Sequence, residues 1–270
     1  MDELYRKYEN LKKTLKSFGR CAVAFSGGVD STFLLKVASD VLKNDVVAIT
    51  VNSNALSKEE LESAKDFCLK NNIKQEIIDF DSFSVSGLIQ NPPDRCYICK
   101  KAIFSKIINV ANEIDIKIIL EGSNFDDDND YRPGKKALKE LGVLSPLRTS
   151  GLTKSEIRML SKELKLPTWQ KESSACLISR FSYGETLTKE KLSMIEKSEK
   201  FLRELGFHKI RVRIHDKLAR IEIAPEELSR AIQERDSITK KLCEFGFTYV
   251  TLDLEGYRMG SMNDMLGLSS

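Results

Sequence analysis

The chain has 270 residues, of which 41% are hydrophobic and 31% are charged, as in a globular protein with one large domain or two smaller ones. Its net charge of +3 is too small to indicate a nucleic acid or a membrane surface as a partner. No stretch approaches about 18 consecutive apolar residues, and the charged segment 1–16 lacks the apolar core of a secretion signal. We therefore expect a protein of the reducing cytoplasm, where paired cysteines indicate a metal rather than a disulfide.

Helical and strand patterns alternate through the first 120 residues. The apolar run at 46–51 is nearly continuous, which suits a strand covered on both faces of a parallel sheet. Ser57 and Glu60 form a capping box at the start of a helix. The expected elements are the helices 4–18, 31–42 and 58–69, a helix after Cys96, and the strands 21–25, 46–51, 73–80 and 116–120. This alternation predicts an α/β fold with a doubly wound parallel sheet, whose ligands bind outside the carboxyl ends of the strands.

The pattern changes near residue 182. A helix over 187–205 is followed by two alternating segments, 209–215 and 218–223, that read as a hairpin. A long helix over 225–245 and a strand over 248–254 complete the chain's regular elements. We therefore predict a sheet domain over residues 1–181 and a small α+β domain over 182–270 that serves substrate binding or oligomerisation.

The segment Ser26-Gly27-Gly28-Val29-Asp30-Ser31 follows the first apolar strand and opens a helix. Glycines in such a turn allow backbone N–H groups and the helix N-terminus to approach a phosphate closely. The spacing differs from that of a P-loop and of a Rossmann glycine motif. It matches the SGGxDS pyrophosphatase loop (PP-loop) of enzymes that cleave ATP to AMP and pyrophosphate. We expect Asp30 to face Mg²⁺ or to cap the helix, and the two roles can coexist.

Cys96 and Cys99 form a Cys-x-x-Cys pair, which suits half a zinc site, a redox dithiol or part of an iron–sulfur site. No second such pair exists, and both histidines fall in the predicted second domain. Cys176, in a polar segment, is the remaining candidate ligand. Three thiolates without a fourth ligand suit a [4Fe–4S] cluster with one open iron that can hold a sulfide, although a redox pair or unrelated thiols stay open. Buried structural roles are expected for the other cysteines, Cys21, Cys68 and Cys243.

Three arginines form a further candidate site. Arg180 follows Cys176 by four residues, and Arg211 and Arg213 lie two apart on a predicted strand, so their side chains leave it on the same side. Their planar guanidinium groups suit a carboxylate or a phosphate of a substrate. Strand arginines without any such role are equally common, so this interpretation stays open.

Six segments spread over nearly the whole chain match one family when they are taken together. They are Ser26–Ser31, Asp126–Gly134, Gly151–Arg158, Ala175–Arg180, Arg211–His215 and Thr251–Met262. In this combination the chain resembles the LarE family, within the larger group of PP-loop enzymes. LarE proteins convert a dicarboxylated pyridinium mononucleotide into its thiocarboxylate, on the way to the nickel-pincer nucleotide cofactor.

The resemblance implies an ATP-dependent sulfur transferase in which a substrate carboxylate is adenylated and sulfur then displaces AMP near Cys176. ATP with Mg²⁺ would lie on the loop, with Asp30 and Cys176 as catalytic residues. The nucleotide-binding residues would be Ser26, Gly27, Gly28, Asp30, Ser31, Thr50, Val51 and Gly122. Phosphate or pyrophosphate groups would be held by Arg180, Arg211 and Arg213, with Arg258 as a weaker candidate.

The cysteine pair separates this chain from many family members, which have a single cysteine and give up its sulfur to leave dehydroalanine. The chain resembles a three-cysteine branch in which Cys96, Cys99 and Cys176 would be metal ligands of a [4Fe–4S] cluster. The family also implies a sulfide or other sulfur donor, a homo-oligomer, and neither nucleic acid nor membrane as partner. A sacrificial Cys176, a tRNA-thiolating enzyme and a binding module without turnover remain alternatives, the second disfavoured by the small charge.

Overall fold

The computed structural model describes residues 2–53, 58–129, 133–171 and 176–258 of the chain. They form two compact units, one of residues 1–85 and 96–174 and one of residues 86–95 and 175–270. The predicted division at residues 181 and 182 stays a prediction. No helix in the described ranges is long and apolar enough to cross a membrane.

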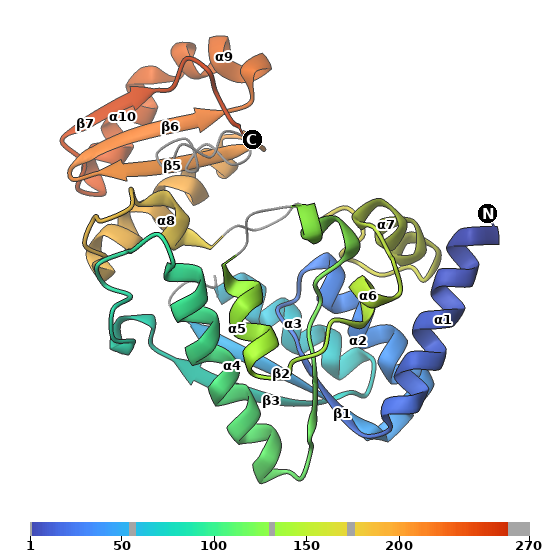
Figure 1. Ribbon diagram of the computed structural model, residues 1–270. Coiled ribbons are helices and arrows are strands. Elements are labelled where there is room, and N and C mark those ends of the chain that lie inside the picture. Colours follow the sequence, from blue (N-terminus) through green and yellow to red (C-terminus); the bar gives the residue numbers. More distant parts are fainter. Residues whose placement is uncertain (1, 54–57, 130–132, 172–175, 259–270) are drawn as a thin grey trace. The chain divides into compact units, whose positions relative to one another are not determined.

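The first unit is built on a parallel sheet of four strands in the order β3-β2-β1-β4. Strands β1, β2 and β3 are labelled in Figure 1. The strands are β1 (Cys21–Ala24), β2 (Val46–Ser53), β3 (Lys74–Phe80) and β4 (Ile118–Leu120). The predicted α/β fold class with a parallel sheet is therefore confirmed. The strand order reverses between β1 and β4, so the carboxyl ends of these two strands flank the position where such sheets bind ligands.

Helices cover both faces of this sheet because alternate residues of β1 enter two different cores. Cys21 and Val23 pack in one core with α1, α2, α3 and α7, whereas Ala22 packs in the other with α4 and α5. The helices are α1 (Asp2–Phe18), α2 (Val29–Leu42), α3 (Lys58–Lys70), α4 (Arg95–Glu113), α5 (Gly134–Glu140), α6 (Pro146–Thr149) and α7 (Lys154–Glu163). Short 3₁₀ turns are η1 (Lys43–Asp45), η2 (Ser82–Ser84) and η3 (Phe125–Asn129). The predicted capping residue Ser57 lies outside the described residues.

The second unit contains a three-stranded sheet in the order β5-β6-β7. Strand β5 runs antiparallel to β6, with Arg211 opposite Glu222, and β7 runs parallel to β6. Its elements are η4 (Leu177–Arg180), α8 (Lys189–Glu204), β5 (Ile210–His215), β6 (Leu218–Ile223), η5 (Pro225–Glu227), α9 (Leu228–Gln233), α10 (Arg235–Glu244) and β7 (Tyr249–Leu252). The prediction of one helix over 225–245 was wrong. Pro225 begins a separate 3₁₀ turn, and the backbone leaves the helical conformation at Glu234 (φ −86°, ψ 7°).

The segment 86–95 joins the second unit through the backbone turn at Asn91. Asn91 adopts a left-handed conformation (φ 49°), and its amide Nδ2 donates to the carbonyl of Ser182 at 2.7 Å. Its own carbonyl accepts from the N–H of Gly184 at 3.0 Å. Arg95 donates to the Asn91 side chain at 2.8 Å and lies over the ring of Tyr183. Sequence periodicity carried no signal for this long-range attachment.

Two arginine–carboxylate pairs are buried within the second unit. Arg213 and Glu222 are each 1% exposed, and the guanidinium contacts both carboxylate oxygens through Nε and Nη2. Arg180 makes the same two-point contact with Glu199, at 2.6 and 3.1 Å. Burial lowers the pKa of Arg213, and Glu222 opposes this shift. Such pairs hold the elements that carry them in place, because separating the partners would leave a buried charge without an opposite charge, which is strongly unfavourable.

Removing one partner of the buried pair therefore tests its structural role. Glu222→Ala leaves Arg213 without this carboxylate, and we expect the free energy of unfolding to fall by about 3 kcal/mol or more. Glu255→Ala removes the partner of Arg258 in an exposed pair and is expected to change it by less than about 1 kcal/mol. Urea unfolding followed by circular dichroism measures both. Equal losses of unfolding free energy in the two variants would show that the buried pair stabilises the fold no more than the exposed pair does.

Candidate functional site

The loop 26–31 forms a tight turn at the carboxyl end of β1. Gly27 has a left-handed backbone (φ 69°) that residues with a Cβ rarely adopt, and Gly28 caps α2 with an extended conformation. The hydroxyls of Ser26 and Ser31 lie 3.0 Å apart. Helix α2 begins at Val29, two residues before the predicted start, so the last loop residues form its first turn. The first N–H groups of a helix lack helical partners, which makes this turn suited to an anion.

Gly122 presses against this turn from the carboxyl end of β4. A Cβ atom built on Gly122 would lie 3.0 Å from the backbone nitrogen of Ser31 and 3.3 Å from the carbonyl carbon of Asp30. Real Cβ contacts are rarely so short, so a side chain here would force the two backbones apart. The structure thus brings together the loop 26–31 and Gly122, both of which the sequence predicts as nucleotide-binding residues, at the switch point of the sheet.

Asp30 is the charged residue of the loop, and it is held by Lys154 of α7. The ammonium Nζ contacts Asp30 Oδ2, and the Lys154 and Asp30 side chains are 28% and 20% exposed. The second oxygen, Asp30 Oδ1, is buried and has no hydrogen-bond partner among the described residues. Burial raises the pKa of Asp30, and the charge of Asp127 adds to this shift, whereas Lys154 and the neighbouring side chain of Asn124 oppose it. Asp30 is not the helix cap, since that position is Gly28.

The start of α7 is fixed beside the acidic loop that follows Gly122. The backbone N–H of Lys154 donates to Asp126 Oδ2 at 2.8 Å. Thr153 and Glu156 form a reciprocal capping box, in which each side chain accepts from the other residue's backbone N–H. Lys7 of α1 in turn donates to Glu156 at 2.8 Å. These contacts hold the base of the Lys154 side chain in place.

Other predicted nucleotide contacts lie at the ends of the neighbouring strands. Thr50 is completely buried near the end of β2, where its hydroxyl accepts from Gln75 at 2.8 Å, and Val51 is half-buried. Lys171 donates to the carbonyl of Gly27 at 3.1 Å. A second lysine therefore contacts the loop, in addition to Lys154.

The Cys-x-x-Cys pair occupies the first turn of α4. Cys96 is exposed and Cys99 is partly exposed, and their spacing of three residues places them on the same side of the helix. The acidic loop ends at this turn, because a Cβ on Gly134 would lie 3.3 Å from the carbonyl oxygen of Cys96 and 2.7 Å from the side chain of Lys100. The segment 122–134 therefore contacts the glycine loop with its first residue and the cysteine turn with its last.

The third predicted ligand, Cys176, belongs to the second unit, where it is exposed just before η4. No group of three or more metal-ligating side chains occurs among the described residues. Cys21 and Cys68 are buried, as expected of structural cysteines, but the same expectation was wrong for Cys243, which is exposed on α10. Helical periodicity around Cys243 could not show which face of α10 is covered.

The three predicted arginines have different environments in the second unit. Arg180 and Arg213 are buried in their carboxylate pairs, and both also contact Ser179, through its hydroxyl and its carbonyl respectively. Arg211 is half-buried, and its partners are the hydroxyl and the ring of Tyr257 and the carbonyl of Arg258. Arg211 therefore keeps a guanidinium that no carboxylate occupies within the described part of the chain.

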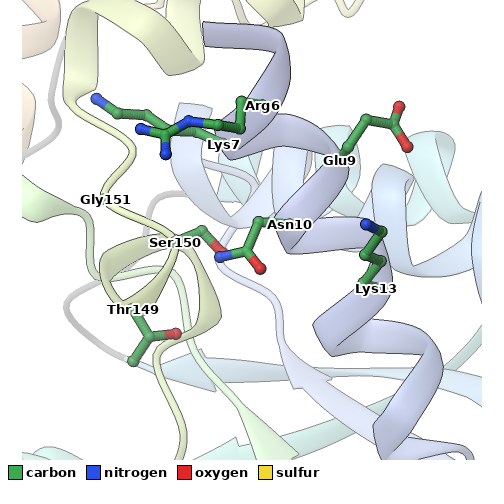
Figure 2. A pocket seen from close by; sticks show the side chains of 8 residues that line it. All are labelled: Arg6, Lys7, Glu9, Asn10, Lys13, Thr149, Ser150 and Gly151. Atoms are coloured by element: carbon green, nitrogen blue, oxygen red, sulfur yellow. The ribbon is translucent and has the colours of Figure 1, made fainter. Parts of the chain in front are cut away.

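A separate pocket of the first unit lies between α1 and the end of α6 (Figure 2). Side chains of α1 with charged or amide groups line it together with the segment 149–151. The lining residues are Arg6, Lys7, Glu9, Asn10, Lys13, Thr149, Ser150 and Gly151. None of the predicted site residues is among them, so this pocket is distinct from the loop 26–31.

Comparisons with known proteins place this geometry in a family. A family model described as "Queuosine biosynthesis protein QueC" matches residues 20–120, which include the glycine loop. The pyridinium-3,5-bisthiocarboxylic acid mononucleotide synthase of Lactiplantibacillus plantarum is 39% identical over 98% of this chain and 97% of its own. The chain belongs to the LarE family.

Two further relatives show how far the similarity extends. The uncharacterized protein slr1717 of Synechocystis is 41% identical over 97% of this chain and 99% of its own. A glutamine-hydrolyzing GMP synthase of Anaplasma marginale is 26% identical over 58% of this chain and 32% of its own. Membership of the LarE family makes the chain an enzyme of sulfur transfer.

Sequence reasoning missed the lysines that contact the glycine loop. Lys154 lies inside the segment 151–158 that supported the resemblance, yet nothing in the spacing linked it to Asp30, 124 residues earlier. Lys171 is the first residue of a polar stretch, and nothing in the sequence linked it to the glycine loop either. The one sequence pattern that could have helped to place Lys154 was the capping pattern at Thr153, because it predicts where α7 begins.

The cysteine environments predict a clear order of reactivity. Burial raises the pKa of both Cys21 and Cys68 to about 12, so only about one thiol in ten thousand is ionised at pH 8. We expect iodoacetamide at pH 8 to leave both unmodified in the native protein while it modifies the exposed Cys243. Peptide mass spectrometry measures the three rates. Modification of Cys21 or Cys68 as fast as Cys243 would contradict the assignment of buried and exposed thiols.

Proposed function

We propose that this enzyme is an ATP-dependent sulfur transferase that acts on pyridinium-3,5-biscarboxylic acid mononucleotide and makes its thiocarboxylate, in nickel-pincer nucleotide biosynthesis. The observation that carries the proposal is the near full-length identity to the synthase of that product's name, combined with an SGGxDS loop at the switch point of the sheet. The identity supports the substrate class, and the loop supports the means of activating a carboxylate.

The activation step requires ATP and a carboxylate of the substrate. A substrate carboxylate oxygen would attack the α-phosphorus of ATP, and the bond to the leaving pyrophosphate would break to give an acyl-adenylate. The N–H groups at the start of α2 and the hydroxyls of Ser26 and Ser31 would hold the phosphates. The adenosine would lie by Gly122 and by the end of β2 at Thr50 and Val51.

Asp30 fits the Mg²⁺ that this reaction implies. Its buried Oδ1 has no hydrogen-bond partner among the described residues, and a carboxylate oxygen is the ligand that Mg²⁺ prefers. When bound, the ion would neutralise phosphate charge as pyrophosphate leaves. The chain's own contribution would be to hold the Asp30 carboxylate beside the N–H groups that would bind the phosphates.

The transfer step requires a sulfur nucleophile at the acyl-adenylate. A sulfide-level sulfur (hydrosulfide) from the sulfur donor would attack the activated carbonyl carbon, and the carbon–oxygen bond to AMP would break, giving the thiocarboxylate and AMP with no change in oxidation state. We propose Cys176 as the residue beside which this exchange occurs. Among the predicted arginines we favour Arg211 for the substrate phosphate, since Arg180 and Arg213 already hold carboxylates at two points.

We also propose that Cys96, Cys99 and Cys176 hold a [4Fe–4S] cluster. The support is the chemistry of the donors: two thiols on one helical turn, and a third exposed thiol elsewhere in the chain. Cys96 and Cys99 supply two of the ligands that such a cluster needs. Among the described residues, no three metal-ligating side chains lie close enough together to hold a metal. We therefore derive no catalytic step through the cluster, and iron analysis tests it independently of turnover.

Asp30→Ala tests the activation step. We expect pyrophosphate release that depends on the pyridinium dicarboxylate to fall by about a hundredfold or more, since the charge that would hold the metal is lost. Asp40→Ala, on the same helix α2, removes the exposed partner of Lys36 and is expected to leave the rate within about twofold. Both variants are assayed for pyrophosphate and AMP. Full activity of Asp30→Ala would overturn the proposed site.

Cys96→Ala tests the metal assignment. Protein purified without oxygen is expected to contain about four irons per chain, and the substitution should remove them while pyrophosphate release persists. Cys243→Ala, at an exposed cysteine outside the proposed set, should keep its iron. Iron and acid-labile sulfide analysis gives the result. A wild-type protein without iron that still transfers sulfur would instead favour a sacrificial Cys176.

A further inference from the structure

Lys154 occupies one oxygen of the loop carboxylate and leaves the other oxygen without a partner. Its Nζ contacts Asp30 Oδ2, whereas Oδ1 is buried and makes no hydrogen bond with any described residue. We propose that Lys154 is a stand-in cation: it neutralises Asp30 in the nucleotide-free enzyme and transfers to the ATP phosphates when a divalent ion takes the carboxylate. This inference rests on the proposed function in that it takes ATP as the nucleotide.

The base of Lys154 is fixed, but its side chain is free to exchange partners. Its backbone N–H is held by Asp126, and the turn around it is held by the Thr153–Glu156 capping box. The rest of the side chain consists of four flexible methylene groups and an ammonium, which, unlike the planar guanidinium of arginine, does not require one fixed orientation toward its partner. A movement of the ammonium by a few ångströms therefore requires no movement of α7.

Charge balance explains why the exchange would be coupled to the nucleotide. A divalent ion that binds Asp30 alone would lie beside the Lys154 ammonium, and the two positive charges would repel each other. Incoming phosphates supply negative charge that both cations can share. Lys154 would thus weaken metal binding to the empty loop and strengthen binding of the metal–nucleotide complex, so that the two ligands enter together.

Metal binding to the nucleotide-free protein tests the first half of this proposal. Mn²⁺, a paramagnetic probe for the Mg²⁺ site, is titrated and its free fraction measured by electron paramagnetic resonance. We expect Lys154→Met to bind Mn²⁺ about tenfold more tightly than wild type, because the competing cation is gone. Lys36→Met, which breaks another lysine–aspartate pair involving α2, should leave the affinity unchanged. Unchanged or weaker binding by Lys154→Met would overturn the proposal.

Two further measurements complete the test. The tighter Mn²⁺ binding should vanish in the double variant Asp30→Asn/Lys154→Met, and its persistence would place the metal elsewhere and sink the proposal. In the presence of Mn²⁺, affinity for the uncleavable analogue α,β-methylene-ATP should fall about tenfold in Lys154→Met, because an ammonium that contacts the phosphates is lost. Equal affinity for the analogue would contradict the transfer of Lys154 to the phosphates.

The wild-type protein provides a measurement that does not depend on whether the variants fold. Acetic anhydride labelling, read by peptide mass spectrometry, reports how accessible each lysine amine is. Saturating Mg²⁺ without nucleotide should raise labelling of Lys154 at least about twofold relative to Lys36, since the ammonium loses its carboxylate partner, and an unchanged ratio would contradict the exchange. Because these metal measurements use no substrate and no sulfur, they distinguish failure of the stand-in role from failure of the proposed sulfur transfer.

Discussion

The approach of Gly122 to the backbone of Asp30 and Ser31 is the constraint on which the candidate site depends. It joins the carboxyl ends of β4 and β1 at the point where the strand order reverses. A Cβ atom at this position would crowd the backbone of Asp30 and Ser31, so glycine suits it, and the adjoining turn carries the first N–H groups of α2, two hydroxyls and one carboxylate. The shape of this turn is thus set by the packing of backbone against backbone.

The acidic segment 122–134 connects two chemically different parts of the first unit. Its first glycine packs on the turn 26–31, and its last packs on the carbonyl of Cys96 at the start of α4. Between them, Asp126 holds the start of α7 and so sets where Lys154 begins. One segment therefore packs on the loop 26–31, holds the start of the helix that carries Lys154 and packs on the cysteine turn.

The fold and the loop could be predicted because their signals are local. Apolar runs at Val46–Ser53 and Cys21–Ala24 and the glycine spacing at 26–31 need no knowledge of distant contacts. The Asp30–Lys154 pair, the attachment of Asn91 to the second unit and the break at Glu234 were missed for the opposite reason. The first two join residues about 90 or more positions apart, and the third is a backbone change that no proline or glycine marks.

The two buried arginine–carboxylate pairs differ in kind from the pair of Asp30 and Lys154. Glu199 and Glu222 each receive two bonds from an arginine fork, so both oxygens are filled and a competing ligand would have to break a planar, two-point contact. Asp30 is paired with a flexible ammonium and lies near the side chain of Asn124, and its buried Oδ1 has no partner in hydrogen-bond geometry among the described residues. The former arrangement is suited to holding strands and helices in place. The latter is suited to exchange, because a new cation gains that second oxygen and displaces only a single point charge.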